Sequence, residues 1–214
     1  MPIITTDKPL RKRSRSDFYP TPHGMAQAAL DLLPEDFSPR FIFDPGHGTG
    51  VWGQAVRKKW GEEVFLSGID IMEFSAPDIY DVTLTGDYLS INCGDYNLIV
   101  GNPPFSLAEE FIRKSVKSLL DGGYVMFLLR LSFLESQKRG LGLYKEFMPW
   151  QVITSSRRPS FTGNGRTDSD GYGIFIWKKG WDRDYYIGKM FYWDYLPEDT
   201  YESIQHKTER DSVS

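Results

Sequence analysis

Residues 41–50 limit the fold of this chain more than any other part of its sequence. They read Phe-Ile-Phe-Asp-Pro-Gly-His-Gly-Thr-Gly, so an apolar strand is followed by an acid and then by glycines at three alternate positions. A helical pattern comes next, with Val51, Ala55 and Val56 on its apolar side. A strand, a glycine-rich turn and a helix in this order form the nucleotide-binding unit of a doubly wound α/β sheet.

The glycine loop departs from the common phosphate-binding motifs. The dinucleotide pattern needs a further glycine where this chain has Val51, and the Gly-Lys-Ser/Thr ending of the P-loop is absent. Asp44 precedes the loop and would repel a pyrophosphate, but its carboxylate suits a ligand that carries an ammonium group. Gly46, Gly48 and Gly50 let the backbone approach such a ligand closely. An ordinary strand-to-helix turn is the alternative interpretation.

A second motif, Asn102-Pro103-Pro104-Phe105, follows an apolar run at residues 96–101. The two prolines fix φ and donate no backbone N–H, so a strand must stop here and a rigid turn must follow. The turn leaves carbonyl oxygens as acceptors, Asn102 adds a side-chain oxygen, and Phe105 adds a flat apolar face. These groups suit a planar ligand with an NH2 group, such as a nucleobase or an amide. A Pro-Pro turn without a ligand is the alternative.

The two motifs together resemble those of S-adenosylmethionine-dependent methyltransferases that act on exocyclic amino groups, above all the adenine-N6 DNA methyltransferases. Residues 17–22, Asp-Phe-Tyr-Pro-Thr-Pro, resemble the N-terminal cofactor motif of that family. Residues 64–70 form a second apolar run that ends in Asp70, and residues 86–89, Gly-Asp-Tyr-Leu, resemble the acidic motif that contacts the cofactor's adenine. The compact form resembles the methyltransferases of phages and prophages.

The resemblance implies a fold and a set of site residues. The expected fold is a doubly wound, seven-stranded Rossmann-like methyltransferase sheet with a C-terminal antiparallel hairpin. The expected cofactor is S-adenosylmethionine, without a metal. The residues expected to hold it are Tyr19, Pro20, Thr21, Asp44, Gly46, Gly48, Gly50, Asp70 and Asp87. The residues expected to act on the acceptor are Asn102, Pro103, Pro104 and Phe105.

The implied function is methyl transfer to the exocyclic N6 amino group of adenine in DNA. Asn102 Oδ1 and the Pro103 carbonyl would each accept a hydrogen bond from one of the two N–H groups of the amine. These bonds would localise the nitrogen lone pair, while Phe105 would stack on the base. An adenine inside a duplex is out of reach, so it must be flipped out or single-stranded. The motifs are too close together in the sequence for an inserted recognition domain, which predicts short or relaxed sequence specificity.

Two other functions remain open from the sequence. The same acceptors suit adenine-N6 methylation of RNA or methylation of a protein glutamine amide, although the glutamine enzymes usually have Tyr where this chain has Phe105. A catalytically silent binding subunit with the methyltransferase fold is the non-enzymatic alternative. Such subunits usually lose the glycines or the Asn-Pro-Pro string, and this chain keeps both.

The length of 214 residues predicts one methyltransferase domain at residues 17–196, between a flexible basic arm at 1–16 and a polar tail at 197–214. No apolar run is long enough for a transmembrane helix or a signal peptide, so a cytoplasmic protein of a bacterium or a phage-infected cell is expected. Cys93 is the single cysteine, which excludes a disulfide framework and a thiolate metal cluster. His47 is expected to face solvent, and contact with the cofactor is the alternative.

The net charge of −4 does not favour a nucleic-acid partner, but the distribution of charge does. Basic residues crowd the N-terminal arm, where they could follow phosphates, although a solvated terminus is equally compatible. The long polar loop at residues 155–171 is expected to face the substrate, although a mobile hairpin without contacts is the alternative. The loop residues expected to bind DNA are Arg157, Arg158, Phe161 and Arg166.

The second half of the chain predicts the remaining elements. Apolar spacing indicates a helix at residues 107–120, which Asp-Gly-Gly at 121–123 would end. A continuous apolar run at 124–129 indicates a strand buried on both faces. A further helix is expected at 135–147, and closing strands at 150–154 and 173–177.

Overall fold

The computed structural model describes residues 20–74, 78–92, 94–155, 170–181 and 190–193. The α-helices are α1 (His23–Leu30), α2 (Val51–Trp60), α3 (Ala108–Lys117), α4 (Gln137–Leu141) and α5 (Leu143–Glu146). The 3-10 helices are η2 (Gly61–Glu63), η3 (Tyr88–Ser90), η4 (Phe105–Leu107) and η5 (Leu131–Leu134). The strands are β1 (Phe41–Pro45), β2 (Phe65–Asp70), β3 (Val82–Thr85), β4 (Tyr96–Gly101), β5 (Leu119–Arg130), β6 (Gln151–Ser155), β7 (Tyr172–Lys178) and β8 (Met190–Trp193).

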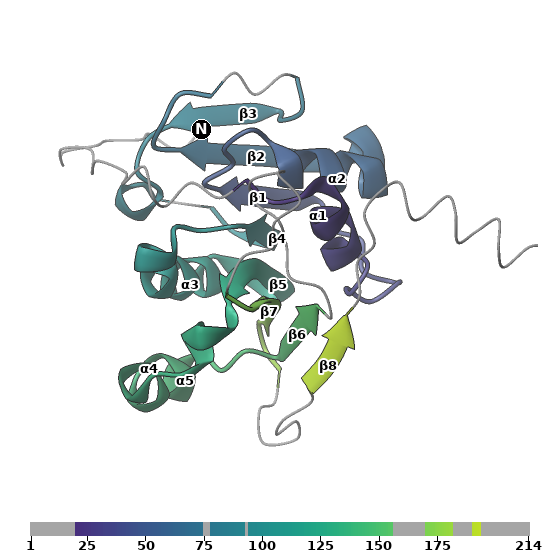
Figure 1. Ribbon diagram of the computed structural model, residues 1–214. Helices are drawn as coiled ribbons and strands as arrows, with labels where there is room; N and C mark the ends of the chain where they lie inside the picture. The colour runs from purple at the N-terminus through teal and green to yellow at the C-terminus, as the bar shows by residue number, and fades with distance from the viewer. Residues whose placement is uncertain (1–19, 75–77, 93, 156–169, 182–189, 194–214) are drawn as a thin grey trace, which may run out of the picture.

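The strands form one sheet in the order β3-β2-β1-β4-β5-β7-β6-β8 (Figure 1). Only β7 runs antiparallel to its neighbours, β5 and β6. The predicted doubly wound sheet with an antiparallel C-terminal hairpin is therefore confirmed. Strand β8 pairs in parallel with β6 and adds an eighth strand to the seven that were expected.

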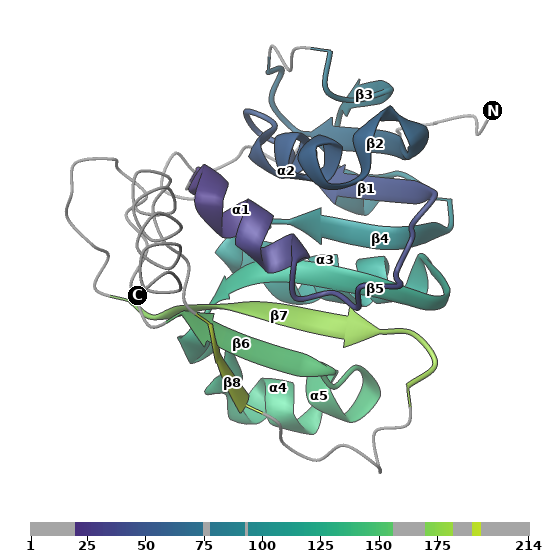
Figure 2. The same cartoon turned by 90° about the vertical axis from the view of Figure 1, so that its right-hand side faces the viewer.

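Helices cover both faces of the sheet. Helices α1 and α2 lie on one face, and α3, α4 and α5 lie on the other (Figure 2). Alternate residues of the central strands point to opposite faces, so Ile42 belongs to the core under α1 and α2 while Phe43 belongs to the core under α3. No helix in the described ranges has both the length and the apolar character needed to cross a membrane.

The order of the strands reverses between β1 and β4, which makes this the switch point of the sheet. Residue Asp44 of β1 pairs with Gly68 of β2, and Phe43 pairs with Ile99 of β4. Strands β1, β2 and β4 therefore run in parallel and end at one edge. Ligands of doubly wound sheets bind in the crevice outside the carboxyl ends of such strands.

The predicted helix at residues 107–120 was too long. Helix α3 ends at Lys117, and Leu119 already pairs with Tyr96 as the first residue of β5. The register of β4 against β5 then shifts before Leu98, and Gly122 has a φ of 76° in the irregular stretch. The glycines expected to end a helix instead form an irregularity inside a strand, because a short apolar run fits either structure.

The predicted helix at residues 135–147 is two short helices. Helix α4 ends at Leu141, α5 starts at Leu143, and Gly142 between them has φ and ψ of −115° and −88°. Glycine has a low helix propensity, so a break at this position is the physical reason for the error. The two closing strands, β6 and β7, are where they were expected.

The registers of the last strands show where each of them ends. Gly173 of β7 pairs with Leu129 of β5 on one side and with Thr154 of β6 on the other. Ser155 at the end of β6 pairs with Trp193 at the end of β8. Strands β6 and β8 therefore end at the same edge as β5.

Candidate active site

The structure brings both sequence motifs to one edge of the sheet. Asp44 is near the end of β1, Asp70 is the last residue of β2, and Asn102 directly follows β4. Asp87 follows β3, the next strand beyond β2. Stretches that are up to about sixty residues apart in sequence thus meet outside the switch point, where a nucleotide-like ligand would bind.

The glycine loop requires glycine for its backbone conformation. Gly46, Gly48 and Gly50 have φ values of 86°, 52° and 84°, a region that other residues adopt only with strain. The N–H of Gly46 donates to the carbonyl of Ile69 over 2.6 Å, which ties the start of the loop to the end of β2. The sequence analysis identified these three glycines from their spacing alone.

Asp70 fixes the glycine loop from the neighbouring strand. Its Oδ2 accepts a hydrogen bond of 3.0 Å from the N–H of Gly48, and its Oδ1 accepts one of 2.9 Å from the N–H of Met72. The side chain is buried. Asp70 therefore holds the loop in shape.

Asp44 is a buried carboxylate with one unpaired oxygen. Its Oδ2 accepts a hydrogen bond of 2.7 Å from the hydroxyl of Tyr80, whereas Oδ1 has no hydrogen-bond partner among the described residues. The pKa of Asp44 is raised to about 7: burial raises it most, the hydrogen bond from Tyr80 lowers it, and the charge of Asp70 raises it. An unpaired buried carboxylate oxygen is costly, so this atom suits a cationic ligand group.

Tyr80 occupies space that two glycines leave for its ring. A Cβ built on Gly53 of α2 would lie 2.6 Å from the hydroxyl oxygen of Tyr80, and one built on Gly68 of β2 would lie 3.1 Å from the ring. Burial, and then the charge of Asp44, raise the pKa of Tyr80 well above its usual value. The phenol therefore stays protonated and acts as a donor.

His47 was expected to face solvent, and this prediction was wrong. The side chain is only 7% exposed. Its ring centroid lies 5.2 Å from that of Tyr80 and 6.2 Å from that of Phe74, and its Nδ1 is 3.0 Å from the carbonyl oxygen of Gly48. The segment after β2 covers the glycine loop and buries the histidine, which no local pattern in the sequence indicates.

Gly101 joins the cofactor side of the site to the acceptor motif. A Cβ built on it would lie 3.3 Å from Oδ1 of Asp44 and 3.4 Å from the carbonyl oxygen of Pro45. Asn102 is the next residue in the chain. The unpaired oxygen of Asp44 thus lies beside Gly101, the residue directly before the Asn-Pro-Pro-Phe turn.

Strand β4 ends at Gly101, before the prolines, as they predict, and the Asn-Pro-Pro-Phe turn then leads into the short helix η4. Asn102 and Phe105 are partly buried, and Pro103 is buried. Pro104 caps η4, and its carbonyl accepts a hydrogen bond of 2.9 Å from the N–H of Leu107. Helix α3 continues from there, so the turn is anchored to a strand on one side and to a helix on the other.

The ring of Phe105 lies beside residues from β5 and β7. The guanidinium carbon of Arg130 is 4.8 Å from the centroid of this ring, and the ring of Tyr172 is 5.8 Å away at an angle of 44°. Arg130 and Tyr172 are paired residues of the two antiparallel strands. Arg130 also forms an ion pair of 3.2 Å with Asp170.

The other predicted site residues fall in several places. Asp87 caps η3, with Oδ1 accepting a hydrogen bond from the N–H of Leu89 and Oδ2 one from the hydroxyl of Ser90. Thr21 is buried just before α1, and Pro20 is exposed. The residues that lie outside the described ranges are Tyr19, Arg157, Arg158, Phe161 and Arg166.

Tyr80, Arg130 and Tyr172 also lie at the site, and none of them was predicted from the sequence. Arg130 directly follows the apolar residues of β5, so its position at the end of a parallel strand was a usable signal. Tyr80 lies in a connecting segment, and its role depends on glycines in two other elements. Only the folded chain brings these residues together.

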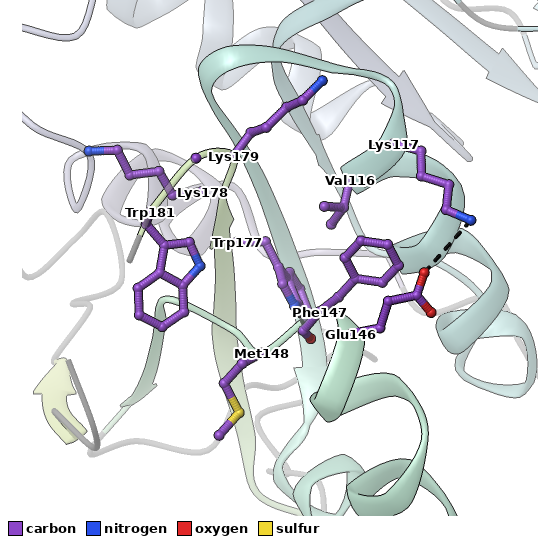
Figure 3. Close-up of a pocket in the computed structure, with 10 residues that line it drawn as sticks. Val116, Lys117, Glu146, Phe147, Met148, Trp177, Lys178, Lys179 and Trp181 are labelled. Atoms are coloured by element: carbon purple, nitrogen blue, oxygen red, sulfur yellow. Dashed lines mark hydrogen bonds and ion pairs between the residues drawn. The ribbon is translucent and has the colours of Figure 1, made fainter. Parts of the chain in front are cut away.

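A separate cavity of about 440 Å³ lies away from these residues (Figure 3). Its lining includes Val116, Phe147, Trp177, Lys178 and Trp181. Strand β7 runs antiparallel to β5, so its last residues lie at the edge opposite to Asn102. Within the described ranges, no group of three or more histidine, cysteine or acidic residues could hold a metal ion.

Solved structures with a similar fold include methyltransferases. A protein of Listeria monocytogenes, assigned as a class I S-adenosylmethionine-dependent methyltransferase, is 16% identical at a TM-score of 0.62, over 88% of this chain and 70% of that chain. A protein of Pyrococcus horikoshii, assigned as an RNA methyltransferase, is also 16% identical at a TM-score of 0.62, over 80% of this chain and 93% of that chain.

A third similar structure is the type I restriction-modification system methyltransferase subunit of Streptococcus thermophilus. It is 15% identical at a TM-score of 0.61, over 76% of this chain and 45% of that chain. No model of a protein family matches the sequence, and neither does any curated protein. The chain thus has the Rossmann-like fold of class I methyltransferases, as the sequence predicted.

Proposed function

We propose that this protein is a methyltransferase that uses S-adenosylmethionine to methylate the exocyclic N6 amino group of adenine in DNA. One observation carries the proposal. The Cβ position of Gly101 lies 3.3 Å from the unpaired Oδ1 of Asp44, and Asn102 follows Gly101 directly. A ligand held near Asp44 and an amine held by Asn102 would therefore meet at one point of the sheet edge.

The residues present fit the proposed cofactor. The ammonium of its methionine part suits the unpaired oxygen of Asp44, and the backbone of the glycine loop can approach it closely because Gly46, Gly48 and Gly50 carry no side chains. Asp70 would accept hydrogen bonds from the ribose hydroxyls. When bound, S-adenosylmethionine supplies the methyl group from its sulfonium, and the electron pair of the broken C–S bond stays on sulfur.

The part of the site that binds the substrate amine needs hydrogen-bond acceptors more than a general base. Asn102 Oδ1 and the Pro103 carbonyl would each accept a hydrogen bond from one of the two N–H groups of the amine. These bonds would localise the nitrogen lone pair for attack on the methyl carbon. The nitrogen then releases one proton to solvent, which balances the positive charge that the sulfonium loses. Fixed acceptors of this kind act by alignment and by electrostatic preorganisation. Phe105 would hold the plane of the base.

A nucleic-acid base is the acceptor that the surroundings of Phe105 favour. The ring lies next to the buried ring of Tyr172 and under the guanidinium of Arg130, which suits a flat base with phosphates near it. The name of the Streptococcus thermophilus subunit, which places it in a restriction-modification system, agrees with a DNA acceptor, whereas that of the Pyrococcus horikoshii protein agrees with an RNA acceptor. The target adenine would have to be extruded from the duplex or lie in a single strand.

The proposal is tested with S-adenosylmethionine labelled in its methyl group. The purified protein is incubated separately with DNA, with RNA of the same sequence and with a glutamine-containing peptide, and each product is digested and separated. The expected result is label in N6-methyladenine from DNA. Label found only in the peptide or only in RNA would replace the DNA acceptor, and no label in any substrate would contradict the enzymatic function.

A further inference from the structure

Arg130 lies where a nucleic-acid strand would pass the proposed acceptor site. It is the last residue of β5, and Gly101 of β4 pairs with Phe127, three residues before it. Its guanidinium carbon lies 4.8 Å from the centroid of the Phe105 ring. The cation is therefore placed over the ring on which, under the proposed function, the target base would stack.

The ion pair between Arg130 and Asp170 joins two side chains that are partly exposed to solvent. Asp170 lies 3.2 Å from Nε of Arg130, and the two side chains are 35% and 43% exposed. Ion pairs at such exposed positions are weak and are screened by salt. A phosphate binds a guanidinium through two parallel hydrogen bonds and competes well with one carboxylate oxygen.

The negative charges around the site would repel a nucleic acid unless a cation lay at this position. Asp44, Asp70 and Asp87 lie at or near the ends of three neighbouring strands, at the same edge of the sheet. A polyanion that approaches this edge is repelled by those carboxylates unless a positive group lies beside the acceptor. Arg130 is the described cation in contact with Phe105.

We propose that Arg130 binds the phosphodiester next to the target base and that Asp170 holds it in place until the strand arrives. The inference rests on the proposed function, because it takes Phe105 as the platform for the base. It assigns the acceptor to nucleic acid, since a glutamine side chain brings no phosphate. Phosphate replaces carboxylate on the guanidinium, and no covalent bond changes.

The experiment measures the affinity of the full chain for an adenine-containing single strand, with S-adenosylhomocysteine present, at several salt concentrations. A DNA strand and an RNA strand of the same sequence form two arms. Arg130→Gln should weaken binding by about tenfold at low salt and reduce the slope of log affinity against log salt by about 1. Asp170→Asn should tighten binding, because it removes the competing carboxylate.

The ion pair between Arg113 and Glu146 provides matched controls. These side chains are 31% and 50% exposed, close to the values for Arg130 and Asp170. Glu146 lines the cavity at the opposite edge of the sheet. Arg113→Gln and Glu146→Gln make the same changes of net charge, so they show what charge alone does to binding. Thermal unfolding of each variant reports on folding.

The outcomes separate the inference from the proposed function. If the wild type methylates a nucleic acid and Arg130→Gln has the same salt slope as Arg113→Gln, the inference is wrong and the function stands. If the wild type binds neither strand and methylates only the peptide, both are wrong. If Arg130→Gln reduces the salt dependence of binding for only one of the two strands, DNA or RNA, then Arg130 contacts the phosphates of that type of nucleic acid. Arg130→Lys should keep most of the slope, because it keeps the charge.

Discussion

The hydroxyl of Tyr80 donates a hydrogen bond of 2.7 Å to Oδ2 of Asp44, and this bond links the segment after β2 to the end of β1. The ring of Tyr80 is positioned by the space that Gly53 and Gly68 leave. The other oxygen of Asp44 therefore has a fixed direction before any ligand binds. A ligand ammonium that reaches Oδ1 would meet a carboxylate that needs no rearrangement.

Tyr80→Phe should weaken cofactor binding and shift its pH dependence. The hydrogen bond from Tyr80 lowers the pKa of Asp44, which burial raises to about 7, so its loss should move this pKa further up. An ammonium prefers the ionised carboxylate, so affinity should rise with pH through about 7 in the wild type and at higher pH in the variant. We expect about tenfold weaker binding of S-adenosylhomocysteine at pH 7, measured by calorimetry.

Tyr144→Phe is the matched control for this experiment. Tyr144 also donates a hydrogen bond of 2.7 Å, but its acceptor is the carbonyl of Phe133. Its removal should leave the pH profile of binding unchanged. If both variants weaken binding equally at every pH, the hydroxyl of Tyr80 has no specific part in holding Asp44.

Asp44→Asn should make the protein more stable at alkaline pH. The pKa of Asp44 rises from 3.8 to about 7 on folding, so between these pH values the folded chain keeps a proton that the unfolded chain has lost, and the free energy of unfolding falls until the pH reaches about 7. Asparagine does not titrate, so the variant should keep the free energy of unfolding that the wild type loses, which is about 4 kcal/mol at most. Urea unfolding of both proteins at pH 5 and pH 8 measures it. A difference that does not change with pH would contradict the raised pKa.

Gly53→Ala should destabilise the protein, although alanine is the better helix former. The new Cβ would lie 2.6 Å from the Tyr80 hydroxyl oxygen and 2.8 Å from Cγ2 of Ile79, so the ring must move. We expect a loss of about 1–3 kcal/mol in the free energy of unfolding. Gly140→Ala is the control, because nothing lies within 4 Å of its Cβ position in α4. That change should stabilise by about 0.5–1 kcal/mol.

Asn102→Ala should abolish methyl transfer and preserve cofactor binding. Removing one preorganised hydrogen-bonding group from an active site lowers the rate by about 100-fold or more. The affinity for S-adenosylhomocysteine, measured by calorimetry, should not change, because the proposed cofactor residues are intact. The exposed Asn92 provides a control with the same substitution. If Asn102→Ala loses cofactor binding as well, its assignment to the acceptor is wrong.

The sequence predicts those parts of the fold that depend on local patterns. The glycine loop has a backbone that only glycine adopts easily, and the prolines end β4, so both motifs could be placed at strand ends without a structure. The error at Leu119 arose because an apolar run after a helix can extend it or begin a strand. Pairing with Tyr96 decides the matter, and that contact is not local.

The parts of the site that the sequence does not reveal come from packing between distant segments. Tyr80 reaches Asp44 across 36 positions of the chain, through space that Gly53 and Gly68 leave. The burial of His47 has the same origin, because Tyr80 and Phe74 cover it. A pattern of residue types within one window contains no information about such contacts.

The register of the last strands has a consequence for labelling this protein. Ser155 of β6 pairs with Trp193 of β8. The residue before it, Thr154, pairs with Gly173 of β7, which in turn pairs with Leu129, the residue before Arg130 in β5. The chain therefore departs from β6 and from β8 beside the proposed acceptor edge. A fluorescent probe or an affinity tag joined close behind β6 or β8 would start next to the proposed acceptor site.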